Sequence, residues 1–176
     1  MEGGAGARLI APAPFPGEDV PLLSIEHLRT RFTSDGRSFL AVDDVSIEVE
    51  AGQTVGVVGE SGCGKSGTAL SVMRLIPEPP GRIVGGRILF DGVDLLALDE
   101  PAMRRIRGKR IGMIFQEPMT SLNPVFTVGE QIGEVLRLHE GMGRAQARAR
   151  AVELLQQVGI PAPEDRVDRY PHELSG

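Results

Sequence analysis

Eight consecutive residues carry the clearest chemistry of this 176-residue chain. They fit the phosphate-binding loop pattern at every fixed position, and they are Gly59, Glu60, Ser61, Gly62, Cys63, Gly64, Lys65 and Ser66. Glycines let successive backbone N–H groups point at phosphate oxygens, and a following helix adds its positive N-terminal end. We expect Lys65 to reach the β- and γ-phosphates and the Ser66 hydroxyl to ligate Mg²⁺. The segment, called the P-loop below, therefore predicts a nucleotide phosphate site.

The flanks of the P-loop support this prediction. Residues 53–58 form a short apolar, β-branched run that is typical of a buried strand. After the loop, apolar side chains recur at helical spacing until Pro77. Strand, glycine loop and helix follow in the order that the chemistry needs, so an accidental glycine-rich turn is the disfavoured alternative. Cys63 fills a variable position and is expected to be a filler residue, with a thiol activated by the helix N-terminus as the alternative.

Composition limits the class of protein. The chain has 19 basic and 24 acidic residues, a net charge of −5, which argues against a nucleic-acid partner. A single cysteine excludes an intramolecular disulfide and favours a reducing compartment. No apolar run approaches the roughly 18 residues of a membrane span. Residues 1–21, rich in Gly, Ala and Pro, are expected to be a disordered tail and not a signal peptide.

Hydrophobic periodicity predicts further elements on both sides of the P-loop. Asp35 and Gly36 mark a turn between two strands, and glycines separate the helices of the last third of the chain. Asp91, before Gly92, is expected to be a turn residue. No internal repeat is present. The expected strands are 23–32, 42–49, 87–90 and a buried strand at 111–115, and the expected helices are 99–108, 128–136 and 151–158.

Four segments together resemble one family. Besides residues 59–66, residues 111–118 resemble a Q-loop, a strand ending in glutamine, and residues 119–124 are typical of peptide importers. Residues 170–176 resemble the entry into an LSGGQ signature. From about residue 22 to residue 176, the chain therefore resembles the ATP-binding subunit of an ABC transporter, most closely the dipeptide and oligopeptide importer group.

The resemblance implies an α/β fold. It is a P-loop NTPase (RecA-like) core with an N-terminal antiparallel β layer and a helical subdomain, incomplete at the C-terminus. Residues 22–116 would hold the β layer and the first part of the core, and residues 117–176 the helical subdomain. The implied ligands are ATP and Mg²⁺. The implied partners are a second ABC ATPase subunit and membrane-spanning permease subunits, contacted through residues 117–170. The implied location is cytoplasmic, peripheral on the inner face of the cell membrane.

The resemblance also implies roles for single residues. Gln116 would touch Mg²⁺ or the attacking water and sense the γ-phosphate; a polar strand cap is the alternative. Phe32 would stack on adenine, with an ordinary core aromatic as the alternative and Phe39 as the second candidate. Gly67, where many family members have Ser or Thr, offers only its backbone N–H to the nucleotide. Ser175 and Gly176 would begin the signature that faces the partner's nucleotide.

The chain also departs from the family pattern. The rest of the signature, the Walker B strand with its Asp and catalytic Glu, and the switch histidine do not occur in the 176 residues. We therefore expect weak nucleotide binding without significant turnover from a truncated chain. A P-loop kinase or GTPase, a non-transport ABC protein working on DNA or ribosomes, and an interaction module remain alternatives. The solute, whether dipeptide, oligopeptide, glutathione or nickel, is left open.

Overall fold

The computed structural model describes residues 20–34, 36–116 and 121–174. The chain divides into two compact units, Met1–Leu98 and Asp99–Gly176, and each is described by itself. Residues 1–19 of the expected disordered tail lie outside the described residues. The boundary expected after residue 116 comes from the family resemblance. It describes a different kind of division from these two compact units, so it stays a prediction.

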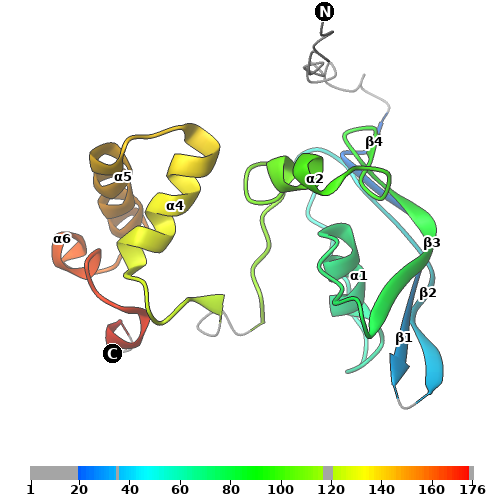
Figure 1. Cartoon of the computed structure of the whole chain (residues 1–176). Coiled ribbons are helices and arrows are strands. Elements are labelled where there is room, and N and C mark those ends of the chain that lie inside the picture. Colours follow the sequence, from blue (N-terminus) through cyan, green and yellow to red (C-terminus); the bar gives the residue numbers. More distant parts are fainter. Residues whose placement is uncertain (1–19, 35, 117–120, 175–176) are drawn as a thin grey trace, which may run out of the picture. The chain divides into compact units, whose positions relative to one another are not determined.

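The first unit is built on an antiparallel sheet in the order β2-β1-β3-β4 (Figure 1). Strand β1 pairs with both β2 and β3, so it is one of the two inner strands of the sheet. The strands predicted at 23–32 and 42–49 are confirmed. The strand predicted at 87–90 begins earlier, because residues 81–87 also pair with β1. The strands are β1 (Leu23–Ser34), β2 (Arg37–Val49), β3 (Gly81–Phe90) and β4 (Val93–Asp94).

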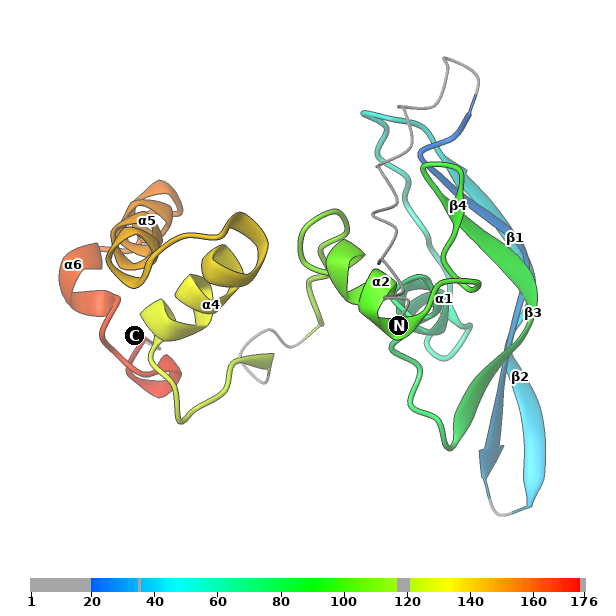
Figure 2. The ribbon, with the colours of Figure 1, turned by 45° about the horizontal axis from the view of Figure 1, so that its top comes forward.

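Helix α1 (Lys65–Val72) follows the P-loop and packs against β1 and β2 (Figures 1 and 2). Leu28 of β1 and Ile88 of β3 are fully buried in the core of this unit. The helix ends earlier than Pro77 because Met73 caps it and Arg74 takes a left-handed backbone conformation with φ 50°. The Arg74 side chain donates to the carbonyl oxygens of Leu95 and Leu98. These hydrogen bonds hold the end of α1 against the segment that follows β4.

Two predictions of buried strands, at 53–58 and at 111–115, are wrong for this structure. Residues 53–58 form no strand, and the exposed fractions of Val55, Val57 and Val58 are 39%, 52% and 92%. In the segment 111–115, only an isolated bridge at Ile111 is present, and Ile114 is 91% exposed. A parallel-type strand becomes buried only between neighbouring strands. The described residues place no such neighbours beside either segment.

The second unit is helical. Its helices are α2 (Glu100–Ile106), α4 (Val128–Glu140), α5 (Arg144–Gln157) and α6 (Pro163–Arg166), followed by a short 3₁₀ turn, η1 (Pro171–Glu173). The predicted helices are thus confirmed. Asp99 caps α2 by accepting from the Ala102 N–H, and Thr127 caps α4 by accepting from the Glu130 N–H. Gly141, with φ 68°, ends α4.

Helices α4 and α5 lie side by side (Figures 1 and 2) and enclose a small core. Its buried members are Val128, Ala151, Leu155 and Val167. The first N–H groups of α4 find acceptors in the segment that follows α6. Val128 donates to the Arg169 carbonyl and Gly129 to the Val167 carbonyl. Within the described ranges, no helix combines the length and apolarity that crossing a bilayer requires.

Candidate functional site

The P-loop is fixed against the sheet at its C-terminal end. Gly64 is the N-cap of α1 and has φ 94°, a conformation that residues with a side chain rarely adopt. A Cβ at this position would collide with the carbonyl oxygen of Ala41 on β2. Position 64 therefore requires glycine for two reasons, the backbone angle and the close approach of β2.

The Lys65 ammonium lies inside the turn of the loop. Its Nζ donates to the carbonyl oxygens of Gly59 at 2.8 Å and Glu60 at 2.7 Å, and to the Cys63 Sγ at 3.4 Å. An ammonium has three protons to donate, so the loop uses all of them. Phosphate oxygens would replace these neutral acceptors with charge-assisted hydrogen bonds, which are roughly twice as strong. The role of Lys65 at the β- and γ-phosphates stays a prediction.

Ser66 and Gly67 form the first turn of α1. The Ser66 hydroxyl is exposed. Gly67 lies close to β2, because a Cβ at this position would be 3.3 Å from the Val42 Cγ2. Magnesium usually binds one or two protein oxygens and completes its shell with phosphate oxygens and water. The Ser66 hydroxyl fits that pattern, and no group of three or more His, Cys, Asp or Glu that could hold a metal occurs among the described residues.

Cys63 contacts its neighbours within the loop, and its expected role as a filler residue stays a prediction. Its thiol is free and exposed, and it accepts from Lys65. A Cβ at Gly59 would approach the Sγ to 2.6 Å, so any larger residue there would have to displace the thiol. The phosphate-loop pattern did not predict these contacts, because it leaves position 63 variable. Whether the thiol is reactive stays a prediction.

Phe32 and Phe39 lie opposite each other on β1 and β2, in the directly paired register. Their rings stack with centroids 6.2 Å apart and an interplanar angle of 19°. The Phe32 ring packs over Gly81, where a Cβ would come within 2.8 Å of Cε1, whereas Phe39 is 57% exposed. Phe32 thus has packing partners of its own and Phe39 an open surface. The adenine-stacking role of Phe32 stays a prediction, with Phe39 as its alternative.

The other predicted site residues, Gln116, Ser175 and Gly176, belong to a different unit of the chain from the P-loop. Gln116 is exposed and belongs to the second unit, whereas the P-loop belongs to the first. Its role at Mg²⁺ or the γ-phosphate stays a prediction. Ser175 and Gly176 lie outside the described residues. Asp91 takes φ 53° in the turn between β3 and β4, which confirms that it is a turn residue.

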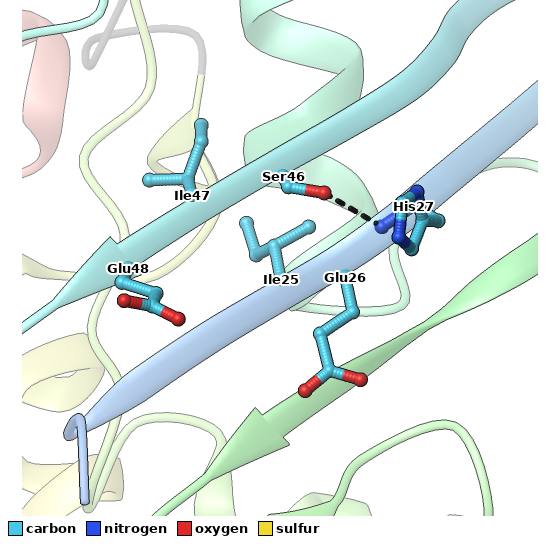
Figure 3. A pocket seen from close by; sticks show the side chains of 6 residues that line it. All are labelled: Ile25, Glu26, His27, Ser46, Ile47 and Glu48. Carbon is cyan, nitrogen blue, oxygen red and sulfur yellow. Dashed lines mark hydrogen bonds between the residues drawn. The ribbon is translucent and has the colours of Figure 1, made fainter.

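A separate cavity of about 460 Å³ lies on the β1–β2 pair (Figure 3) and is lined by Ile25, Glu26, His27, Ser46, Ile47 and Glu48. The His27 N–H donates to the Ser46 Oγ across the two strands, at 2.9 Å. The His27 Nδ1 also pairs with the Asp44 carboxylate at 2.8 Å. No residue of the P-loop lines this cavity, so it is not a candidate for the phosphate site.

Comparison with known proteins adds to this geometry. The ABC transporter family matches residues 42–176, which include the whole P-loop. A protein of Brucella abortus named as a peptide import ATP-binding protein is 58% identical over 161 residues, covering 89% of this chain and 48% of that protein. The oligopeptide transport ATP-binding protein of Bacillus subtilis is 52% identical over 155 residues, covering 88% of this chain and 43% of that protein. The chain thus spans less than half the length of these curated relatives.

A solved structure supports the fold. It is the dimeric, post-hydrolysis state of an ATP-binding cassette bound to ADP and phosphate. Its TM-score is 0.74 at 23% identity, with 87% of this chain and 63% of that chain covered. The expected fold class, an α/β P-loop fold of the ABC ATPase type, is confirmed.

Proposed function

Because the chain belongs to the ABC transporter family, we propose that it is the nucleotide-binding portion of an importer ATPase. It binds Mg-ATP at the P-loop and, in the assembled transporter, powers peptide uptake across the membrane. The observation that carries the proposal is the Lys65 ammonium enclosed by the loop at the start of α1. The relatives are named for peptide import and oligopeptide transport, which supports the peptide group.

The binding step follows from the residues of the loop. Lys65 exchanges the Gly59 and Glu60 carbonyls for phosphate oxygens, and the N–H groups at the start of α1 add their partial positive charge. The Ser66 hydroxyl supplies one ligand to Mg²⁺, which neutralises charge on the phosphates when bound. Gln116 has an amide that both donates and accepts, which suits a contact with water or metal.

The partners belong to the same proposal. A second ATPase subunit pairs with this chain, and permease subunits contact residues 117–170 from the membrane. Apolar side chains on α4 suit such a contact, because Val135 and Leu138 are exposed. The protein then works in the cytoplasm, peripheral to the inner face of the membrane. The net charge of −5 supports the absence of a nucleic-acid partner.

A nucleotide competition experiment tests the proposal. The full chain is titrated with a fluorescent ATP analogue in the presence of Mg²⁺, and unlabelled ATP and GTP then compete for the site. We expect displacement by ATP at lower concentration than by GTP, and weaker binding when EDTA removes Mg²⁺. Preference for GTP would favour a GTPase, and absence of binding with intact helical content would favour an interaction module.

A further inference from the structure

Hydroxyl groups line the contact between α1 and the sheet. Thr30 of β1 and Ser71 of α1 are both 0% exposed, and their Oγ atoms lie 2.9 Å apart. The Ser71 Oγ also lies 2.7 Å from the Gly67 carbonyl oxygen, one turn back along α1. A chain of two hydrogen bonds thus crosses a buried helix–sheet interface.

The direction of this chain follows from its protons. A carbonyl oxygen can only accept, so Ser71 donates its single hydroxyl proton to Gly67. The Oγ of Ser71 is then left to accept, and Thr30 must be the donor. The order is therefore Thr30 to Ser71 to Gly67, and no buried side-chain N or O atom in the described residues is left without a partner.

Stability alone does not account for this pair. Replacing both partners of a buried hydrogen bond by apolar groups of the same shape is often nearly neutral. A hydrogen bond is directional, however, and weakens steeply when its angle changes, so it specifies one position of α1 along β1. The hydroxyl chain therefore holds α1 at one position along β1.

Both ends of the chain lead to the candidate site. Thr30 lies two residues before Phe32, on the same face of β1. Gly67 follows Ser66 at the end of the P-loop. We propose that Thr30 and Ser71 are positioning residues that fix the phosphate loop relative to the Phe32–Phe39 pair, so that one nucleotide engages both. This inference rests on the proposed ATP binding.

The proposal predicts a specific change in ligand preference. Inorganic triphosphate reaches only the P-loop, whereas ATP also reaches the aromatic pair, so the ratio of their Kd values reports the coupling. Thr30→Val keeps the shape of the side chain and removes the hydroxyl. We expect this variant to lower the preference for ATP over triphosphate by about 3- to 10-fold, the effect of one hydrogen bond, while triphosphate affinity stays unchanged.

Two further variants separate positioning from packing. Thr30→Ser keeps the hydroxyl and loses the methyl group, so it should retain the native preference. Thr33→Val is the matched control, because the Thr33 Oγ1 makes an equally short 2.9 Å contact with the Ser38 Oγ on the exposed side of the same hairpin. It should leave the preference unchanged.

The experiment is calorimetric titration of the full native chain and its variants with Mg-ATP and with Mg-triphosphate. Absence of binding of both ligands to the native chain overturns the proposed function and the inference with it. Binding of both ligands by the native chain, with an unchanged preference in Thr30→Val, overturns the inference alone. So does equal weakening of both ligands, which would indicate a packing role.

Circular dichroism shows whether each variant is folded. If Thr30→Val is unfolded, Ser71→Ala takes its place with the same expected loss of preference. If both variants are unfolded, the hydroxyl pair is needed for folding itself, and the positioning role is overturned.

Discussion

At the scale of single residues, we expect Lys65 to decide how tightly the P-loop binds a nucleotide. Its Nζ is held by the Gly59 and Glu60 carbonyls, so its charge is already placed at the centre of the loop. Lys65→Ala removes charge-assisted hydrogen bonds worth roughly 1.5–3 kcal/mol. ATP affinity should fall by about 10- to 150-fold in a fluorescent-nucleotide titration.

The chain offers a matched control for this substitution. Lys109 is the only other lysine, and its Nζ donates to the His139 carbonyl in the second unit. Lys109→Ala should leave ATP affinity unchanged. Equal affinities of the native chain and Lys65→Ala would contradict the assignment of the phosphate site.

Cys63 provides a label for the same site without mutation. Its thiol is exposed and lies against the Lys65 ammonium, so phosphates bound there should cover it. We expect saturating Mg-ATP to slow the reaction of Cys63 with a maleimide, measured by mass spectrometry over time. At an Mg-ATP concentration just sufficient to saturate the native chain, the protection should be much smaller in the Lys65→Ala variant, because that variant binds ATP more weakly. Identical rates with and without nucleotide in the native chain would place Cys63 away from bound phosphate.

Comparison of two ligands, ATP and triphosphate, shows which ring of the aromatic pair stacks on adenine. If Phe32 stacks on adenine, Phe32→Ala should cost ATP binding about 1–3 kcal/mol, by analogy with base–aromatic stacking, and should change triphosphate binding little. Phe39→Ala is the parallel variant, because its ring is the more exposed of the pair. Equal losses for both ligands in Phe32→Ala would indicate that its contact with Gly81 is the one that matters.

At the scale of elements, charge holds the short helix α2. The Arg107 guanidinium donates to the Glu100 carboxylate over 2.6 Å, and this bond is the main reason that the pKa of Glu100 lies below its ordinary value of 4.5. Arg104 lowers the pKa of Glu100 further. A carboxyl whose pKa is lowered by folding stabilises the fold above its unfolded pKa. That contribution is lost as the pH falls through the lower, folded value.

The Glu100→Gln variant tests this predicted dependence of stability on pH. The variant should be less stable than the native chain at pH 7, and the difference should shrink as the pH falls below 4.5, because the native carboxyl is then protonated. Urea unfolding at several pH values gives the measurement. Glu134→Gln, at an exposed glutamate on α4, is the control. A gap between Glu100→Gln and native protein that stays constant with pH would rule out the ion pair as the cause.

At the scale of the whole molecule, we expect the apolar segments at 53–58 and 111–115 to influence solution behaviour. Both are apolar and largely exposed, and neither belongs to a strand in the described part of the chain, although Ile111 forms an isolated bridge. Such segments are templates for pairing with another chain. We expect the 176-residue chain to self-associate with increasing concentration in sedimentation velocity.

A charge within the first segment should reduce this association. Val57→Lys places a charge among β-branched residues that favour cross-strand pairing. Val93→Lys, on the short strand β4, is a control, because this valine is also exposed but lies outside both segments. A native chain that stays monomeric at all concentrations, or a Val93→Lys effect as large as that of Val57→Lys, would contradict the expectation.

The sequence by itself determined the features that a few neighbouring residues encode. The glycines and Lys65 of the P-loop specify a turn and a charge within eight positions. Alternating side chains predicted β1 and β2, and helical spacing punctuated by glycines predicted α4 and α5. These predictions held because backbone sterics and periodicity act over one turn or one strand.

Tertiary structure alone decided what depends on residues far apart in the chain. The apolar composition of 53–58 and 111–115 predicted strands, but a strand exists only where another strand pairs with it. The packing of Phe32 over Gly81 and the contact between Thr30 and Ser71, which are 41 positions apart, were likewise invisible in the sequence. A hydroxyl in a sequence has many possible partners, and only the docking of α1 on β1 selects one of them.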